Sequence, residues 1–288
     1  MIKNYMKLMR VHHYIKNILI FATLACSGNI FNWDKLIDCG LGFLAFCFVS
    51  SAIYIVNDIR DKDKDRAHPT KCNRPIASGS VSVTSAWILA AVLIVLSAVF
   101  NSLVFTPYSS ILIVLYFALN LGYSFGLKNV PLVDITILVS GFLIRILYGS
   151  FITNITVSNW LYLTVIAVAF YFALGKRRNE IKKSENVGQT RAVLKAYPVN
   201  FLDRNMYMCQ ALTNVFYALW CMDENTMSFY NNKYLIFTVP IVLLITMKYS
   251  MNIEGDSDGD PVEVLLHDKI LLALCTIYLA AMFVILYI

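Results

Sequence analysis

Long apolar segments follow one another from the beginning of this 288-residue chain to its end. A helix that crosses the hydrocarbon core of a bilayer needs about 20 mostly apolar residues. Nine segments approach that length, the first of them the weakest: 15–31, 36–56, 83–102, 108–126, 132–152, 158–175, 204–222, 233–251 and 269–287. Charged residues make up only 15% of the chain, against about 25% in soluble domains. The sequence therefore predicts an all-α polytopic membrane protein with about nine transmembrane helices in a single domain, residues 1–288.

The basic residues gather at three places, although the net charge is only +6. The N-terminus up to Lys16 carries four of the 24 Lys and Arg residues, loop 57–82 carries six, and loop 176–203 carries seven. With nine spans and an internal N-terminus, all three places lie on the same side of the membrane. The positive-inside rule makes that side cytoplasmic. We expect an integral protein of the bacterial inner membrane with a cytoplasmic N-terminus.

Loop 57–82 also contains aspartates, which contribute little to membrane orientation. If the preceding helix continues past residue 56, Asn57, Asp61 and Asp65 recur at every fourth residue, and Asp58 joins them seven residues before Asp65. Carboxylates that share a helix face repel one another unless a cation lies between them. Oxygen ligands next to substrate phosphates suit Mg²⁺. The pattern predicts a Mg²⁺ site; the alternative is a solvated helix end with alternating charge.

Basic residues and two prolines follow the aspartates. The prolines prevent a continuous helix here, so Lys71 and Arg74 can fold back toward the acidic residues and bind phosphate oxygens. Asp63 faces away from the other aspartates and receives no role. A magnesium-bound diphosphate would suit this mixture of charges.

A second group of polar residues surrounds the turn 126–131. Tyr123 and Lys128 lie at this turn, Asp134 opens the fifth predicted span, and Arg145 lies inside that span. Eleven residues are close to three helical turns, so Asp134 and Arg145 face the same way, roughly 16 Å apart. An arginine inside a membrane span is a candidate functional residue. The alternative is a pairing with a carbonyl or a carboxylate inside the bundle.

Further basic residues stand where spans meet the cytoplasm. Lys176 and Arg177 follow the sixth predicted span, and Lys16 opens the first. They are candidates for phosphate binding, and the alternative is contact with lipid headgroups. The acidic loop 254–268 spaces its aspartates like a calcium loop, but Pro261 replaces the required glycine. We interpret this loop as a lid.

Several stretches of the chain resemble the UbiA superfamily of membrane prenyltransferases, and most closely its decaprenyl-phosphate phosphoribosyltransferase branch. They are RVHHYIKNILIFA, SSAIYIVNDIRDKDKDRAHPTKCNRPIASG, GYSFGLKNVPLVDITILVSGFLIRILYG, FALGKRRNE, YPVNFLDRN and GDPVEVLLHDK. The resemblance spans almost the whole chain. It implies a UbiA-like helical bundle with a catalytic cleft on the cytoplasmic side, lined by loops 57–82 and 176–203.

The resemblance also implies an activity, namely transfer of the 5-phosphoribosyl group from 5-phosphoribosyl 1-diphosphate to a polyprenyl phosphate, with release of diphosphate. The implied metal is Mg²⁺, with Mn²⁺ as its substitute, held by Asp58, Asp61 and Asp65, while Asn57 supports donor binding. Membrane lipid is an expected partner and nucleic acid is not, and a homo-oligomer stays open. Two other functions remain, a UbiA-type prenyltransferase with an aromatic acceptor and a lipid-phosphate transporter.

The residues expected to serve this activity form two sets. The expected catalytic residues are Asp58, Asp61, Asp65 and Asp134. The expected substrate-binding residues are Lys16, Asn57, Lys71, Arg74, Tyr123, Lys128, Arg145, Lys176 and Arg177.

Overall fold

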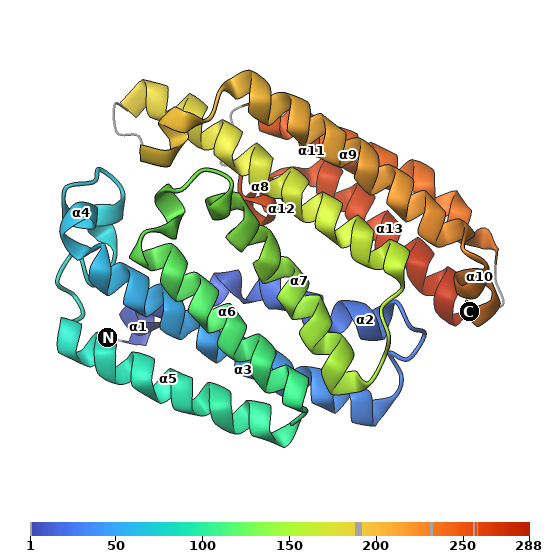
Figure 1. Ribbon diagram of the computed structural model, residues 1–288, viewed down its shortest axis with the longest axis horizontal. Coiled ribbons are helices and arrows are strands. Elements are labelled where there is room, and N and C mark those ends of the chain that lie inside the picture. Colours follow the sequence, from blue (N-terminus) through green and yellow to red (C-terminus); the bar gives the residue numbers. More distant parts are fainter. Residues whose placement is uncertain (1, 188–191, 231–232, 256, 258) are drawn as a thin grey trace. The chain divides into compact units, whose positions relative to one another are not determined.

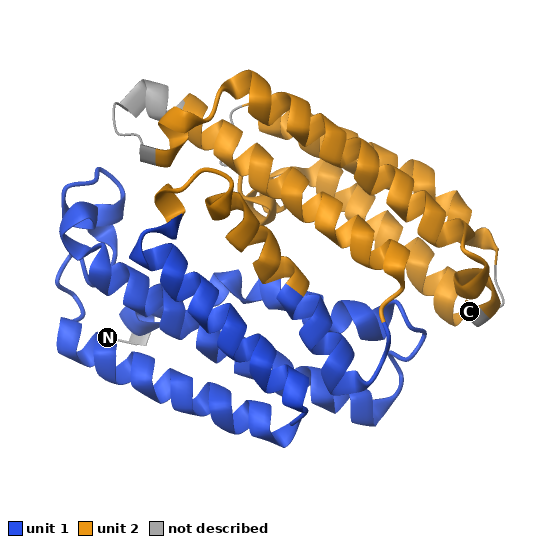
Figure 2. Ribbon diagram, in the orientation of Figure 1, with its two compact units in different colours: residues 1–127, 144–156 blue, residues 128–143, 157–288 orange. Residues whose placement is uncertain are grey.

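The computed structural model describes residues 2–187, 192–230, 233–255, 257 and 259–288. Across this described part, all regular secondary structure is helical (Figure 1). The chain divides into two compact units (Figure 2): residues 1–127 and 144–156 form unit 1, and residues 128–143 and 157–288 form unit 2. Helix α7 (Val133–Thr153) contributes its first half to unit 2 and its second half to unit 1.

Unit 1 contains the N-terminal helices. They are α1 (Ile2–Met9), the 3₁₀ helix η1 (Val11–Phe21), α2 (Ala22–Ala25), α3 (Trp33–Arg60), α4 (Lys62–Arg66), η2 (Lys71–Asn73), α5 (Val83–Leu103) and α6 (Pro107–Phe125). The long helix α3 packs against η1, α5 and α6. Polar side chains cap the starts of the long helices: Asn32 caps α3, Ser82 caps α5, and Thr106 forms a capping box with Ser109 at α6.

Two groups of buried apolar side chains hold unit 1 together. One lies between η1, α3, α6 and the second half of α7, and its members Phe46 and Tyr148 are fully buried with their ring centres 4.8 Å apart. The other lies between α1, α3 and α5 and includes Leu8 and Ile55. The apolar residues of loop 67–82, Ile76 and Val81, join this second group. The loop therefore has its own attachment to the bundle.

Unit 2 contains the C-terminal helices. They are α8 (Asn159–Val187), η4 (Ala192–Ala196), α9 (Val199–Met222), α10 (Glu224–Tyr230), η5 (Tyr234–Thr238), α11 (Val239–Glu254), α12 (Pro261–His267) and α13 (Lys269–Tyr287). Helix α8 packs against α9, α9 against α11, and α11 against α13, so the long helices run side by side (Figure 1). Their shared core includes Tyr171, Leu202, Met206 and Ile253. The short 3₁₀ turn η3 (Leu127–Asn129) joins the units in sequence.

Seven helical segments in the described part of the chain are long and apolar enough to cross a membrane. They are α3, α5, α6, α7, α8, the continuous segment η5–α11, and α13. Their outer faces carry exposed apolar side chains, such as Ile88 and Val95 on α5 and Ile277 and Leu279 on α13. Apolar surface of this extent suits contact with lipid. The chain is an integral membrane protein.

Two of the nine predicted spans are not among these seven segments. Segment 15–31 is built by η1 and the single turn α2 instead of one long α-helix. Segment 204–222 lies inside the continuous helix α9, which is not among the seven apolar segments. Polar residues such as Asn205, Gln210 and Asn214 dilute the apolar character of α9. The number nine stays a prediction.

Candidate functional site

The predicted acidic group lies in unit 1, where α3 ends and α4 begins. Asp61 caps the end of α3. The amide of Asp61 donates to the carbonyl of Asn57 at 2.9 Å, and the amide of Asp65 donates to the carbonyl of Asp61 at 2.8 Å. The four-residue hydrogen-bond spacing of a helix therefore continues through the break between α3 and α4. This continuity is what the predicted common face of Asn57, Asp61 and Asp65 requires.

Burial distinguishes the aspartates of this segment. Asp58 and Asp65 are only 3% and 5% exposed, and Asp61 is partly buried. The side chain of Asp63 is 92% exposed. Asp63 thus faces solvent, as its place on the helix predicts, and the carboxylates predicted to hold a metal lie in the less exposed positions.

Two arginines pair with the buried carboxylates. Nη1 of Arg74 lies 2.7 Å from Oδ2 of Asp65 and 3.1 Å from Oδ1 of Asp58. Nη2 of Arg10 lies 2.6 Å from the same Oδ1 of Asp58. A single guanidinium nitrogen therefore touches both carboxylates. Asp58 and Asp65 are close enough to share one cation.

This arrangement bears directly on metal binding. Among the described residues, no three His, Cys, Asp or Glu side chains converge as a complete set of metal ligands. The donor atoms of Asp58 and Asp65 are nevertheless carboxylate oxygens that already surround one positive group, which is the ligand chemistry that Mg²⁺ prefers. The residues present therefore fit a divalent cation in the position of the Arg74 guanidinium. The role of Asp61 as a third ligand stays a prediction.

Loop 67–82 holds Arg74 in this position. Nε of Arg66 donates to the carbonyl of Ala77 at 3.0 Å, and Nζ of Lys7 donates to the carbonyl of Asn73 at 2.9 Å. The first bond ties the loop to α4 and the second ties it to α1, and Arg74 reaches the acidic residues as the two prolines lead us to expect. Lys71 is partly exposed. The phosphate contacts of Arg74 and Lys71 stay predictions.

His68 shapes the start of the same loop. Its Nδ1 lies 3.3 Å from the amide of Thr70 and 3.4 Å from that of Lys71. Burial, followed by the positive charge of Lys71, lowers the pKa of His68 below its ordinary value. At neutral pH a neutral imidazole can accept these bonds, which supports the turn that presents Lys71.

Asn57 contacts the end of α6. The hydroxyl of Ser124 donates to Oδ1 of Asn57 at 3.1 Å, next to the predicted substrate-binding residue Tyr123. Arg60, to which we assigned no role, donates to the carbonyls of Ser124 and Phe125 and lies 4.2 Å above the Phe125 ring. It satisfies carbonyls that the last turn of a helix leaves unbonded. The contact explains why a basic residue stands at the end of α3.

Arg145 is buried inside unit 1, with only 7% of its surface exposed. Its Nε donates to Oδ1 of Asn17 at 2.7 Å, and its Nη2 donates to the hydroxyl of Tyr116 at 2.9 Å. The guanidinium also lies 4.8 Å from the centre of the Tyr116 ring. These contacts connect η1, α6 and α7. Lys16, the neighbour of Asn17, is partly buried, and the substrate roles of Lys16 and Arg145 stay predictions.

Asp134 is fully buried in unit 2. Its Oδ2 accepts from Nε of Arg177 at 2.7 Å and its Oδ1 accepts from the hydroxyl of Tyr197 at 2.6 Å. Arg177, 1% exposed, also donates to Glu180 at 2.6 Å. Burial, together with the hydrogen bond to Asp134, raises the pKa of Tyr197 to about 12, so its phenol stays protonated at neutral pH. These contacts favour a structural role for Asp134 and Arg177, and their predicted catalytic and binding roles are untested.

Lys176 is more accessible than Arg177. Its Nζ lies 3.3 Å from Oδ2 of Asp260, and about a third of its side chain is exposed. Nδ2 of Asn179 donates to the carbonyl and hydroxyl of Ser257 at 3.1 and 2.9 Å. Gly259 has a φ of 71°, and a Cβ there would lie 3.0 Å from the Cα of Lys176. This part of the predicted lid therefore lies directly on α8.

Asp256 and Asp258 of the acidic loop lie outside the described residues. Lys128 is partly buried in η3. The contacts of Lys128 with substrate stay a prediction.

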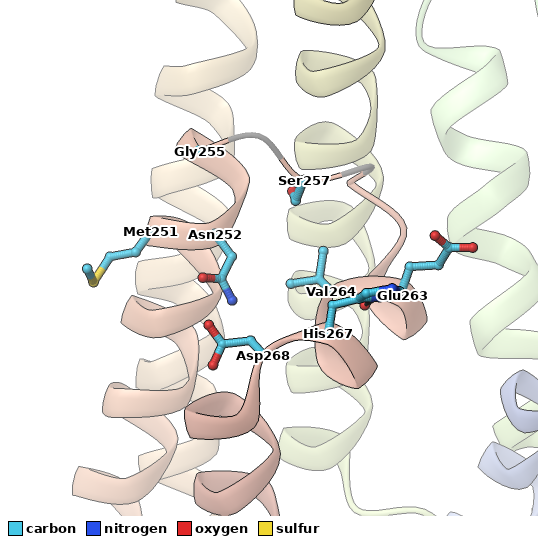
Figure 3. A pocket seen from close by; sticks show the side chains of 8 residues that line it. All are labelled: Met251, Asn252, Gly255, Ser257, Glu263, Val264, His267 and Asp268. Atoms are coloured by element: carbon cyan, nitrogen blue, oxygen red, sulfur yellow. Dashed lines mark hydrogen bonds between the residues drawn. The ribbon is translucent and has the colours of Figure 1, made fainter.

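A cavity of about 480 Å³ lies between α11, α12 and the start of α13 (Figure 3). It is lined by Met251, Asn252, Gly255, Ser257, Glu263, Val264, His267 and Asp268. Asp268 caps α13, and its hydrogen bond with Lys248 lowers its pKa to about 2. None of the predicted site residues lines this cavity.

Arg10 is the main site residue that sequence reasoning missed. The signal was present, because Arg10 opens the first stretch that resembles the UbiA superfamily. Its partner Asp58 is 48 residues away. Pairings over such a separation are not visible in local sequence patterns.

Known proteins of similar sequence support the family resemblance. The UbiA prenyltransferase family matches residues 18–266. The decaprenyl-phosphate phosphoribosyltransferase of Corynebacterium glutamicum is 36% identical over 96% of this chain and 85% of its own length. The enzyme of the same name from Mycolicibacterium smegmatis is 33% identical over 94% of this chain and 88% of its own length.

Solved structures agree on the fold. A UbiA homologue from Archaeoglobus fulgidus, bound to GPP and Mg²⁺, superimposes with a TM-score of 0.72 at 17% identity, covering 98% of this chain and 99% of that one. At this identity the likeness concerns the fold alone. Since the family match covers most of the sequence and the two relatives are aligned over more than nine tenths of this chain, the chain belongs to the UbiA prenyltransferase family.

Proposed function

We propose that this chain transfers the 5-phosphoribosyl group of 5-phosphoribosyl 1-diphosphate to a polyprenyl phosphate and releases diphosphate. The observation that carries the proposal is the match, over 96% of this chain, with a relative named decaprenyl-phosphate phosphoribosyltransferase. The name supports both the phosphoribosyl donor and the lipid-phosphate acceptor. The chain is accordingly a transferase that acts in the membrane.

The acidic group of unit 1 is the proposed donor site. Asp58 and Asp65, which share one guanidinium nitrogen, would hold Mg²⁺ together with Asp61, and Mn²⁺ could replace it. Asn57, Lys71 and Arg74 would bind the donor around it. The carboxylates would hold the metal, and the basic side chains would bind phosphate oxygens of the donor.

The chemistry needs charge stabilisation more than proton transfer. The bond between the anomeric carbon and the diphosphate oxygen breaks, and the diphosphate leaves with the bonding electrons. An oxygen of the acceptor phosphate forms the new bond to that carbon, which has oxocarbenium character as in glycosyl transfer. The acceptor is already ionised at neutral pH, so no general base is required. Bound Mg²⁺ would neutralise charge on the departing diphosphate.

The chain's own cations would complete this stabilisation. With Asp58 and Asp65 engaged with the metal, the Arg74 guanidinium would be free to donate to phosphate oxygens beside them, together with Lys71 of the same loop 67–82. The remaining residues predicted to bind substrate would do so as well: Lys16, Tyr123, Lys128, Arg145, Lys176 and Arg177. Asp134, predicted to be catalytic, would act on the reaction through its buried partners Arg177 and Tyr197.

The finer membrane arrangement is also proposed. With nine spans and an internal N-terminus, the basic N-terminus and loops 57–82 and 176–203 would lie on one side of the membrane, and the positive-inside rule makes that side, with the active site, cytoplasmic. The bacterial inner membrane suits this arrangement, because the phosphorylated sugar donor is a soluble anion that cannot cross the bilayer unaided. The whole chain would act as one catalytic domain.

The test uses purified protein in lipid nanodiscs with Mg²⁺, ribose-labelled donor and polyprenyl phosphate. The proposal expects a labelled lipid that forms only when acceptor and metal are both present. Prenylation of an aromatic acid from prenyl diphosphate, without any labelled lipid, would instead identify a UbiA-type prenyltransferase. Movement of polyprenyl phosphate across proteoliposomes that persists in Asp58→Ala and Asp61→Ala variants would favour a lipid-phosphate transporter.

A further inference from the structure

Arg10 stands at an unusual point of the backbone. It joins α1 to η1 with φ 52° and ψ 48°, the left-handed conformation. Residues other than glycine seldom adopt this conformation, and arginine is not among those enriched in it. When such a residue persists, the surrounding structure must hold it in place, and such positions concentrate at functional sites.

The backbone around Arg10 is tied to α3. The hydroxyl of Ser51 donates to the carbonyl of Met9 at 2.8 Å, and the same hydroxyl lies 2.8 Å from that of Tyr14. The amide of His13 donates to the carbonyl of Arg10 at 2.8 Å. The turn is therefore anchored on both sides of Arg10.

The Arg10 side chain extends from this turn to a predicted metal ligand. Its Nη2 lies 2.6 Å from Oδ1 of Asp58, and its guanidinium lies 4.7 Å from the centre of the Tyr54 ring. The Arg10 side chain is 20% exposed and that of Asp58 is 3% exposed. Packing on Tyr54 and the hydrogen bond to Asp58 together restrict the guanidinium to one direction.

Arg10 and Arg74 contact the acidic group in different ways. Arg74 bridges Asp58 and Asp65 through one nitrogen and thus stands where a shared cation would be held. The hydrogen bond of Arg10 to this group goes to Asp58. A metal ion would compete with Arg74 for its place, whereas Arg10 can keep its contact with Asp58 while the metal is bound.

We propose that Arg10 is a positioning residue that orients the Asp58 carboxylate for the metal and diphosphate site. The inference rests on the proposed function, since it assumes that Asp58 is a metal ligand. Groups that hydrogen-bond to metal ligands fix their orientation, and their loss typically weakens metal affinity or activity about 10- to 100-fold. The left-handed turn at Arg10 would then have a function, because it directs the guanidinium toward Asp58.

The test measures Mn²⁺ binding to the purified full-length protein without donor, by the electron paramagnetic resonance signal of free Mn²⁺. Arg10→Gly removes the side chain but keeps a residue that adopts the left-handed turn readily. Arg10→Gln keeps the length, and Arg10→Lys keeps the charge. Lys3→Gln, an exposed charge loss on α1, is the matched control.

We expect Arg10→Gly and Arg10→Gln to bind Mn²⁺ about 10- to 100-fold more weakly than the unmodified protein. Arg10→Lys should be intermediate, and Lys3→Gln unchanged. Arg74→Gln should bind Mn²⁺ at least as tightly as the unmodified protein, because the guanidinium that competes with the metal is gone. Its KM for the donor should rise, because a proposed phosphate contact is lost. A positioning role also predicts that Arg10→Gly lowers kcat and that Arg10→Lys, which keeps a positive charge beside Asp58, restores part of it.

Each alternative result has a definite meaning. Unchanged Mn²⁺ affinity in Arg10→Gly would overturn the inference, because Arg10 would then serve only the turn. If Arg10→Gln does not fold, Arg10→Gly and Arg10→Lys decide the question by the same measurement. If the unmodified protein binds no Mn²⁺ yet forms the labelled lipid, the metal site and this inference both fail while phosphoribosyl transfer stands. If it binds Mn²⁺ but forms no labelled lipid, only the transfer proposal fails.

Discussion

At the scale of single residues, the aspartates that follow α3 differ in what surrounds them. Asp58 and Asp65 are buried against arginines, whereas the side chain of Asp63 is 92% exposed. All three belong to one short polar segment, so their difference comes from helical geometry. Residues that are three, four or seven positions apart share a helix face, and Asp63 falls outside that series.

The first prediction compares two aspartates of this segment. Asp61→Asn should lower turnover by at least two orders of magnitude, because loss of a metal ligand removes about 3 kcal/mol or more of charge stabilisation. Asp63→Asn is the matched control and should retain full turnover. Both should unfold at the same temperature as the unmodified protein. Steady-state formation of labelled lipid measures the effect, and near-normal turnover of Asp61→Asn would remove Asp61 from the metal site.

The second prediction concerns the buried pair in unit 2. Asp134→Ala removes one of the two carboxylates that pair with the buried Arg177 guanidinium, and the acceptor of the Tyr197 hydroxyl, and should lower the free energy of unfolding by about 3 kcal/mol. The double variant Asp134→Asn with Arg177→Gln should lose less than the two single variants together, because the charges are then removed as a pair. Unfolding in mixed micelles measures this coupling. A folded Asp134→Asn variant with unchanged stability and no turnover would show that the carboxylate takes part in the reaction.

Residue-level prediction from the sequence succeeded where the pattern is local. Helical spacing was enough to separate Asp63 from its neighbours, and the two prolines were enough to bring Arg74 back toward the acidic residues. The pairing of Asp134 with Tyr197 could not be predicted, because 63 residues separate them. The role of Arg10 depends on a left-handed turn, and an arginine gives no local signal for such a turn.

At the scale of helices, η1 shows how an apolar segment can take an unexpected form. A 3₁₀ helix rises about 2.0 Å per residue, so its 11 residues extend about 22 Å. The four residues of α2 add about 6 Å. This total is close to the roughly 30 Å of the hydrocarbon core. Hydropathy alone predicts an apolar segment here but cannot distinguish an α-helix from a 3₁₀ helix.

The third prediction tests the packing of η1. A Cβ on Gly149 of α7 would lie 2.1 Å from the carbonyl oxygen of Ile20, a backbone atom that cannot move alone. Gly149→Ala should therefore displace η1 and lower the free energy of unfolding by about 1–3 kcal/mol. Gly40→Ala on α3 is the control, because its Cβ would meet nothing within 4 Å. Equal unfolding temperatures for the two variants would contradict this close contact.

The fourth prediction concerns Arg145, which connects η1 with α6 and α7 through Asn17 and Tyr116. If this junction serves the lipid acceptor, Arg145→Ala should raise the KM for polyprenyl phosphate about tenfold, the equivalent of one charge-assisted hydrogen bond. The donor KM should stay unchanged. Tyr116→Phe, which removes one hydroxyl, should have a smaller effect. A selective rise in the donor KM would place Arg145 at the other substrate.

At the scale of the whole molecule, apolar side chains cover much of the surface, and several charged residues of the candidate site are buried. Exposed apolar side chains on α5 and α13 suit contact with lipid, while the carboxylates of Asp58 and Asp134 are buried and paired with arginines. This separation of apolar spans from charged segments could be predicted from the sequence, because the hydropathy of a segment depends only on its composition. The sequence could not predict that the described chain forms two compact units that share α7, because such units depend on tertiary packing.

The fifth prediction addresses membrane topology. Nine spans with an internal N-terminus place the C-terminus outside the cytoplasm. A C-terminal alkaline phosphatase fusion should therefore be active, and a C-terminal green fluorescent protein fusion should stay dark. The same fluorescent protein at the N-terminus should be bright. Both termini on one side would indicate an even number of spans, and the segment formed by η1 and α2 or the polar helix α9 would then not cross.

The most direct test of the proposed activity measures both products of one reaction. Purified protein in nanodiscs receives ribose-labelled donor, polyprenyl phosphate and Mg²⁺, and the labelled lipid and the released diphosphate are counted together. The proposed transfer predicts equal amounts of the two products, and neither product when the metal is chelated or the acceptor is omitted. Diphosphate release that proceeds without acceptor, or a complete absence of labelled lipid, would contradict it.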